Sequence, residues 1–296
     1  MTERSATESQ GLIEKLNVSG LQLSKGQKRI AAYIEEHYEK AAFMTAAVIS
    51  KACQVSESTV VRFACALGYQ GYPEFRQALA GLVRPRLTSE QRFEIAAGIR
   101  QEELPDVVLK NDMANIRRTM ETLSREAFDQ AVSLLLGARR VYVLGLRAAA
   151  PLAQFLYLYL HQILEETVLV QNAVGDVFEE MARIGQEDVL MAISYPRYSS
   201  RTLECMKLAR NRGAQVVALT DSPHSPLYPE AQVCLCASTD MTSFVDSLAA
   251  PLSVINALVV CLGLNRREEL SEHFKQMEEI WDAHQVYAGK GDEPRP

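Results

Sequence analysis

Hydroxyl and guanidinium groups gather in two stretches of the chain, each directly after a short apolar run. Residues 145–149 read Gly-Leu-Arg-Ala-Ala, and residues 194–202 read Ser-Tyr-Pro-Arg-Tyr-Ser-Ser-Arg-Thr. Both lead into segments with helical patterning, and a helix N-terminus offers free N–H groups and a positive dipole end to an anion. We therefore expect a site for a small organic anion. Its candidate residues are Gly145, Arg147, Ser194, Arg197, Ser199 and Ser200. A third stretch, residues 220–223, also follows an apolar run and is a further candidate loop.

Enzyme chemistry finds less support in the sequence. Sugar isomerisation would need a general base beside the substrate, and the available groups are better interpreted as solvated helix faces or isolated loop residues. Those groups are His161, Glu165, Glu166, Glu179, Glu180 and His224. The chain has no G-x-G-x-x-G or Walker motif, so no nucleotide cofactor is expected. Cys234 and Cys236 would share one face of a strand. Without a C-x-x-C motif or a nearby histidine cluster, small buried hydrophobes are favoured over a metal or redox pair.

A second constellation has the pattern of a helix-turn-helix. Ser24, Thr45 and Ser56 can each cap a helix, and Val60 and Phe63 would face inward. The exposed N-terminal end of the second helix would then meet base edges in the major groove of DNA. The candidate DNA contacts are Lys51, Ser56, Glu57, Ser58, Thr59 and Arg62. Candidate phosphate contacts are Lys25, Lys28, Arg29, Lys51 and Arg76.

The elements that must position these groups divide the chain into two kinds of structure. Residues 11–83 have helical patterning throughout, whereas short apolar strands alternate with helices from residue 139 onward. This pattern predicts an all-α helix-turn-helix bundle followed by a three-layer α/β domain with a mainly parallel sheet. We expect domains at 11–86 and 137–296. The intervening linker, 87–136, holds two amphipathic segments, 107–123 and 128–136, with a break at Pro105; these either bridge the domains or form a dimerisation surface.

Composition narrows the class of protein. The 296 residues are 48% hydrophobic and 23% charged, which suits two globular domains. Residues 1–86 carry net positive charge and the remainder net negative charge, so only the first part is expected to approach a polyanion. The longest apolar runs are about half the length that a membrane span needs, and the first ten residues are polar. A cytoplasmic location is therefore expected.

The helix-turn-helix region resembles that of the RpiR/MurR family of bacterial transcriptional regulators. The resemblance covers residues 23–82 and depends on Ser-Glu-Ser-Thr-Val-Val-Arg-Phe at 56–63 and Leu-Gly-Tyr-Gln-Gly-Tyr-Pro-Glu-Phe at 67–75. Cys65 stands where the family pattern has a basic residue, which would remove one phosphate contact. Residues 140–264 resemble the sugar isomerase (SIS) domain that usually follows in these regulators.

The SIS resemblance implies binding of a phosphosugar through loops rich in serine and threonine, but this sequence departs from that pattern. Ala148 and Ala149 replace a first-loop serine, and Pro196 and Arg197 replace the serine and glycine of a Ser-x-Ser-Gly-x-Thr loop. Proline has no N–H to donate, whereas Arg147 and Arg197 can supply charged donors. The expected ligand is therefore a small anionic metabolite, either a sugar phosphate or a sugar acid.

These observations together predict a DNA-binding transcriptional regulator, without enzyme activity or cofactor, whose SIS-like domain senses the anion. Two alternatives stay open: an isomerase-type enzyme, and a regulator whose SIS-like domain binds no ligand and serves only for dimerisation. The expected partner is a palindromic double-stranded operator. We expect a homodimer or homotetramer, joined through the apolar helices predicted at 151–164 and 248–264.

Overall fold

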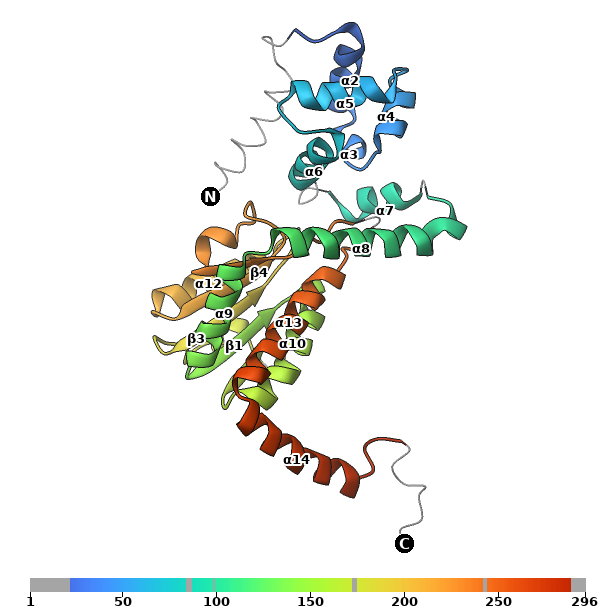
Figure 1. The fold of residues 1–296 in the computed structure, drawn as a ribbon. Coiled ribbons are helices and arrows are strands. Elements are labelled where there is room, and N and C mark those ends of the chain that lie inside the picture. The colour runs from blue at the N-terminus through green and yellow to red at the C-terminus, as the bar shows by residue number, and fades with distance from the viewer. Residues whose placement is uncertain (1–21, 84–86, 98, 172–174, 242–243, 289–296) are drawn as a thin grey trace. The chain divides into compact units, whose positions relative to one another are not determined.

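The computed structural model describes residues 22–83, 87–97, 99–171, 175–241 and 244–288. The described part of the chain forms two compact units, one within residues 22–109 and 241–246 and one within residues 110–240 and 247–288 (Figure 1). This division follows compactness alone, so the functional ranges 11–86, 87–136 and 137–296 remain a prediction.

The first unit is helical. Its elements are α2 (Lys25–Glu36), α3 (Tyr38–Ala41), α4 (Ala46–Ala52), α5 (Glu57–Ala66), α6 (Tyr72–Val83), α7 (Ser89–Ala97) and the short 3-10 helix η2 (Gln101–Glu103). The predicted caps are confirmed, because the hydroxyls of Ser24, Thr45 and Ser56 each accept a hydrogen bond from the backbone N–H three residues later. The apolar faces of these helices meet in one core, which includes Ile30, Ile34, Ile49, Val60, Phe63 and Phe75.

The aromatic run after α5 builds this core rather than a binding surface. Gly68 has φ +92°, a conformation that favours glycine, and it ends the helix. Tyr69 and Phe75 lie edge to face, and the Tyr72 hydroxyl donates to the Met44 carbonyl at 2.9 Å. Burial raises the pKa of Tyr72 to about 12, so the phenol stays a neutral donor.

The second unit contains the sheet, and it begins within α8 (Leu104–Thr122). The predicted break at Pro105 is wrong: proline sits in the first turn of α8, where its missing N–H costs no helical hydrogen bond. Helix α9 (Arg125–Gly137) follows, capped by Ser124. The chain then alternates as β1 (Arg140–Gly145), η3 (Arg147–Ala149), α10 (Ala150–Ile163), β2 (Thr167–Val170), α11 (Val177–Glu180), β3 (Asp188–Ile193), α12 (Ser200–Asn211), β4 (Gln215–Thr220), η4 (Tyr228–Glu230), β5 (Val233–Cys236), α13 (Ala249–Asn265) and α14 (Arg267–Ala283).

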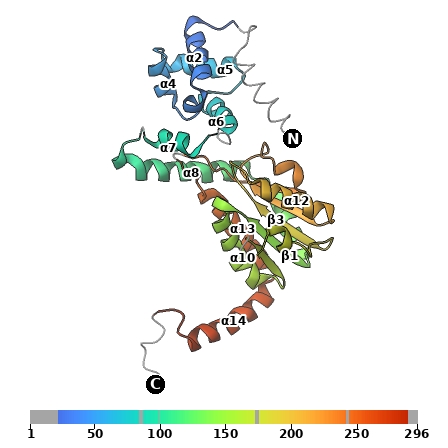
Figure 2. The ribbon, with the colours of Figure 1, turned by 180° about the vertical axis from the view of Figure 1, so that it is seen from behind.

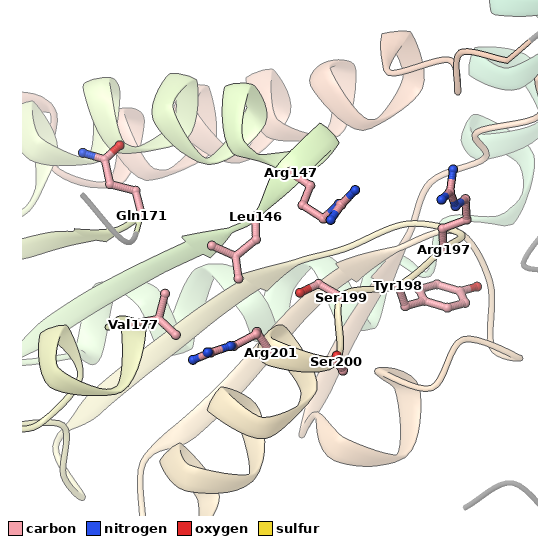
Figure 3. Close-up of a pocket in the computed structure, with 9 residues that line it drawn as sticks. All are labelled: Leu146, Arg147, Gln171, Val177, Arg197, Tyr198, Ser199, Ser200 and Arg201. Carbon is pink, nitrogen blue, oxygen red and sulfur yellow. The ribbon is translucent and has the colours of Figure 1, made fainter. Parts of the chain in front are cut away.

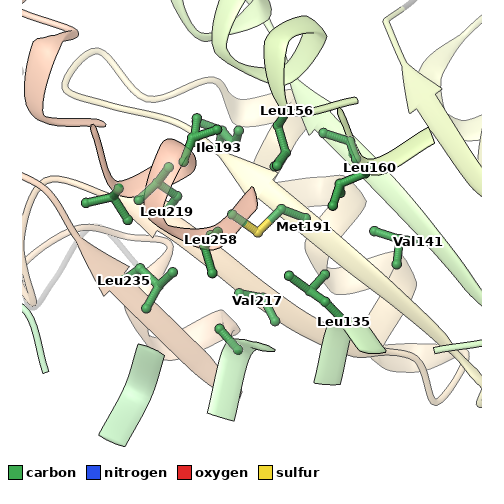
Figure 4. Packing of buried hydrophobic residues seen from close by; sticks show 14 of the residues in the cluster. Leu135, Val141, Leu156, Leu160, Met191, Ile193, Val217, Leu219, Leu235 and Leu258 are labelled. Carbon is green, nitrogen blue, oxygen red and sulfur yellow. The ribbon is translucent and has the colours of Figure 1, made fainter. Parts of the chain in front are cut away.

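All neighbouring strands of the sheet are parallel, in the order β2-β1-β3-β4-β5. One face is covered by α9, α10 and α13, and the other by α11 and α12, so the predicted three-layer fold is confirmed (Figures 1 and 2). Alternate strand residues enter opposite cores: Val141 and Val143 on one face, Tyr142 and Leu144 on the other. Figure 4 shows the first of these cores, where Leu156 and Leu258 come from helices and Met191 and Val217 from strands.

One helix, α14, was not predicted from the sequence. Helix α14 is amphipathic, but none of its residues is buried in this structure. Within the described ranges, no single helix is long and apolar enough to cross a membrane; α13 and α14 reach that length only together, and they are bent by 100°.

Candidate DNA-binding surface and anion pocket

The helix-turn-helix consists of α4, a tight turn and α5. The turn is closed by the Val55 N–H, which donates to the Ser50 carbonyl at 2.9 Å, and Gln54 adopts a left-handed φ of +51°. Val60 and Phe63 are fully buried, as predicted, which fixes the outward face of α5. The scaffold for a recognition helix is therefore present.

The predicted DNA contacts lie together at the start of this helix, but they are not equally available. Lys51, Glu57, Ser58 and Arg62 are exposed, and Thr59 is half-buried. The Ser56 hydroxyl is already engaged. It accepts from the Thr59 N–H at 3.3 Å and lies 2.9 Å from the Ser58 hydroxyl and 2.8 Å from the Thr59 hydroxyl. In this structure Ser56 acts as the helix cap.

Helix α2 brings additional positive charge to the same end of α5. A β carbon at Gly26 would lie 3.2 Å from the Thr59 methyl group, so the first turn of α2 directly contacts the start of α5. The Arg29 guanidinium donates to the Gln54 carbonyl at 3.1 Å, while Lys25 and Lys28 are exposed. Sequence reasoning missed Gln54, because a positive φ at a glutamine leaves no signal in residue type.

The second candidate site lies where the strand order of the sheet reverses. Strands β1 and β3 are adjacent, and the chain leaves them toward opposite faces, which in open α/β sheets creates a crevice at the carboxyl ends. A pocket of about 570 Å³ occupies this place. Figure 3 shows its lining: Leu146, Arg147, Gln171, Val177, Arg197, Tyr198, Ser199, Ser200 and Arg201. The structure therefore brings the two predicted loops together.

Arg147 and Arg197 share an unusual backbone. Arg147 has φ +56° and Arg197 has φ +67°, the left-handed region that β carbons disfavour. Arg197 occupies the position where the SIS-like pattern has glycine, which explains that conformation. Both side chains are exposed at the pocket. Strained backbone held at a pocket is a common property of binding sites.

The serines of the second loop have distinct roles. The Ser199 hydroxyl caps α12 by accepting from the Thr202 N–H at 3.3 Å, and Ser200 is exposed in the first turn. Ser194 is buried and does not line the pocket; its hydroxyl accepts from the Ser199 N–H at 3.3 Å and thereby holds the loop. Pro196 is buried between them.

Gly145 also lies outside the pocket lining. A β carbon there would lie 2.7 Å from the Ala149 carbonyl oxygen and 2.8 Å from the Ala153 β carbon. Real β carbons do not approach atoms that closely. Gly145 therefore allows α10 to start directly against β1, which aims the N-terminus of α10 at the crevice.

Arg201 was missed as a pocket residue, although it lies in the quoted loop. It donates to Asp176 at 2.5 Å and lies over the Phe178 ring at 5.6 Å. The Phe178 N–H and the Arg201 guanidinium hold the pKa of Asp176 below its usual range. Gln171, also missed, follows β2, and its backbone N–H is fixed by Glu180 at 2.9 Å. Residues after β2 gave no sequence signal because they carry no charged or hydroxyl cluster.

The third candidate loop lies outside the pocket but contacts one of its lining residues. The Tyr198 hydroxyl donates to Asp221 at 2.8 Å, and the Thr220 hydroxyl lies 2.7 Å from that of Ser225. None of residues 220–223 lines the pocket. The loop therefore positions Tyr198.

No carboxylate or histidine is among the described residues that line the pocket. The isomerase candidates are not among the lining residues, although Glu180 accepts from the backbone N–H of the lining residue Gln171. Glu166 pairs with Arg140, Glu179 belongs to the Asp176 capping box, and His161 stacks on Tyr157. The pocket as described offers guanidinium groups but no general base.

The cysteines give no second site. Cys234 and Cys236 are half-buried on one face of β5, as their spacing predicts, and each is a free thiol. In the part of the chain that the structure describes, no group of three histidine, cysteine or acidic side chains could hold a metal ion.

This combination, a helix-turn-helix unit and a parallel α/β unit with a pocket at its switch point, defines a two-domain transcriptional regulator. The family model "Helix-turn-helix domain, rpiR family" matches residues 10–85, and that of the SIS domain matches residues 134–261. The chain belongs to the RpiR family of bacterial transcriptional regulators.

Individual relatives agree with this assignment. The HTH-type transcriptional regulator HexR of Pseudomonas aeruginosa is 28% identical over 281 residues, which cover 90% of this chain and 94% of that protein. The sugar isomerase domain of the RpiR transcription factor from Sphaerobacter thermophilus is 26% identical, with a TM-score of 0.57, and covers 60% of this chain and 99% of its own. The Vibrio vulnificus NanR protein, solved with ManNAc-6P, has the same fold at 22% identity; its TM-score is 0.56, with coverage of 94% and 100%.

Proposed function

We propose that this regulator binds a palindromic operator through residues 11–86 and senses a small organic anion through residues 137–296, with residues 87–136 as the linker. One observation carries the sensing proposal. Arg147 and Arg197 are exposed at one pocket whose described lining includes no acidic side chain, while the third lining arginine, Arg201, is paired with Asp176. Guanidinium groups bind phosphate and carboxylate in the same forked geometry, so a sugar phosphate and a sugar acid both fit.

The proposed ligand contacts are divided between charge and hydrogen bonding. Arg197 and Arg147 supply charge, and the backbone N–H groups at the start of α12 supply donors. The start of α10 offers fewer, because the Ala149 and Ala150 N–H groups already donate to the Leu146 and Arg147 carbonyls and Pro151 has no N–H. Ser199 and Ser200 add hydroxyls, while Ser194 and Gly145 shape the loops.

The proposed operator contacts are Lys51, Glu57, Ser58, Thr59 and Arg62, with Ser56 holding the helix that carries them. Cytoplasmic placement follows from this role, because the operator is chromosomal DNA. A twofold-symmetric operator calls for two copies of the chain. Helix α13 exposes Val260 and Leu264, at 59% and 67%, and α10 exposes Leu158 at 53%. We propose that these apolar surfaces join copies into a homodimer or homotetramer.

The experiment has two stages. DNA fragments selected by the purified protein define the operator, and fluorescence anisotropy then measures operator affinity with and without sugar phosphates and sugar acids. Sensing requires that the anion change the affinity, because a ligand that binds both states equally shifts nothing. Arg197→Ala should abolish the change while leaving ligand-free operator binding intact.

Three outcomes are distinguishable. An effect on wild type that is lost in Arg197→Ala supports the proposal. Operator binding that no anion alters supports the alternative in which the SIS-like domain only joins copies. Turnover of a sugar phosphate would establish the enzyme alternative.

A further inference from the structure

Helix α8 exposes a continuous apolar stripe. Leu109, Met113, Ile116 and Met120 are 61%, 69%, 40% and 75% exposed, and their spacing of four, three and four residues places them on one side of the helix. Figure 1 shows α8 as a single unbroken helix. Large apolar side chains in such a row indicate a contact surface rather than isolated exposure.

The opposite side of α8 contacts residues 238–240 of the same chain. Asn115 and Thr119 are buried, and the Asn115 amide donates to the Asp240 carbonyl at 2.9 Å. The Thr119 hydroxyl accepts from the Ser238 N–H at 2.8 Å, and Arg118 pairs with Asp240. The helix is therefore fixed along one side, with the apolar stripe facing away from these contacts.

We propose that this stripe is a seam between two copies of the chain, in which two α8 helices pair side by side and parallel. The four-three-four spacing matches the a and d positions of a heptad repeat, with Met113 and Met120 at a and Leu109 and Ile116 at d. A stripe that repeats in this way is self-complementary, as a twofold contact between identical chains requires. This contact is additional to the α10 and α13 surfaces, and each can fail without the other.

Charge on the flanks of the stripe selects the parallel direction. In this register Asp112 is a g residue and Arg117 is the e residue of the next heptad. A parallel pair places Asp112 of one copy beside Arg117 of the other, twice by symmetry. An antiparallel pair would instead bring the e positions of the two copies together, which are Lys110 and Arg117. Among the described residues, Asp112 makes no ion pair within its own chain.

Crosslinking of the full-length protein tests the seam. Cys65 is the one exposed cysteine of the structure as described, so Cys65→Ser is the parent. Met113→Cys and Met120→Cys are then introduced separately and treated with a short bis-maleimide. Parallel pairing predicts links from 113 to 113 and from 120 to 120, identified by mass spectrometry of the linked peptides. Ala114→Cys is the matched control, since it is exposed on the same helix but lies outside the stripe.

Exchanging the flanking charges provides the second test. With Met113→Cys as reporter, Asp112→Arg should lower the crosslink yield severalfold, because it places two arginines beside each other. Adding Arg117→Asp should restore the yield. Thermal unfolding of each variant separates loss of pairing from loss of folding. A restored crosslink yield in the double variant shows that the single change acted on the pairing of the helices.

Self-links at 113 and 120 well above the 114 control, together with rescue by the charge exchange, support the seam. Yields at 113 and 120 no higher than at 114 would overturn it and leave this face to another part of the same chain or to a different protein. Links from 113 to 120 only, in a mixture of the two variants, would overturn the parallel arrangement. Failure of the charge exchange to restore the yield would overturn the proposed register.

Discussion

Arg197 combines a strained backbone with a proposed binding role, so two substitutions at this position should separate the two properties. Arg197→Gly and Arg197→Ala both remove the guanidinium group. Only glycine also removes the β carbon that disfavours the observed φ of +67°. The comparison of the two variants therefore isolates the backbone, whatever other contacts the arginine side chain makes.

The magnitude follows from two opposing terms. A left-handed conformation costs a residue with a β carbon about 1–2 kcal/mol, and glycine loses about 0.4–1 kcal/mol through the greater entropy of its unfolded chain. Arg197→Gly should therefore be more stable than Arg197→Ala by about 0.5–1 kcal/mol. For a unit of this size that corresponds to a difference in melting temperature of about 1–4 °C. Differential scanning calorimetry of the full chain measures it.

Anion binding should change in the same way in both variants. Loss of a charged hydrogen bond costs about 1.5–3 kcal/mol, which weakens binding about tenfold to a hundredfold. Inorganic phosphate serves as the probe in calorimetric titration until an effector is identified. A glycine variant no more stable than the alanine variant would refute the argument from strain. Equal phosphate affinity in wild type and both variants would place Arg197 outside the anion site.

Three further predictions concern the other surfaces. Arg62→Ala should weaken operator binding by about 1–3 kcal/mol if Arg62 reads a base, measured by anisotropy at fixed salt; an equal loss on unrelated DNA would assign Arg62 to a phosphate, and no loss would remove it from the interface. Gly145→Ala should lower stability by about 1–3 kcal/mol through overpacking, whereas Gly137→Ala, which meets no atom within 4 Å, should not; equal unfolding midpoints would contradict the close contact with α10. Val260→Glu should shift sedimentation toward smaller species while Gln276→Glu, on α14, should not, and an unchanged oligomer would exclude α13 from the contact between copies.

Local sequence was sufficient for most elements. Residues 24, 45 and 56 carry hydroxyl caps that depend only on atoms three residues away, so the starts of α2, α4 and α5 followed from residue type. The alternation of short strands with helices from residue 139 onward likewise followed from short apolar runs. By contrast, α14 was missed although its apolar residues have helical spacing. The break predicted at Pro105 was wrong because proline is compatible with both a break and a first turn.

Some functional residues were likewise evident from local sequence, and others only from the tertiary structure. The sequence by itself determined the two-part architecture, the helix-turn-helix and the two loops that carry Arg147 and Arg197, because caps, periodicity and strand-to-helix junctions are encoded locally. Only the tertiary structure decided which of the candidates share a pocket. Parallel pairing of β1 with β3 brings together loops about fifty residues apart. The pocket that results also includes Gln171 and Arg201, whereas Ser194 and Gly145 do not line it. That selection depends on strand order and on the direction of individual side chains, which arise from packing across the whole sheet.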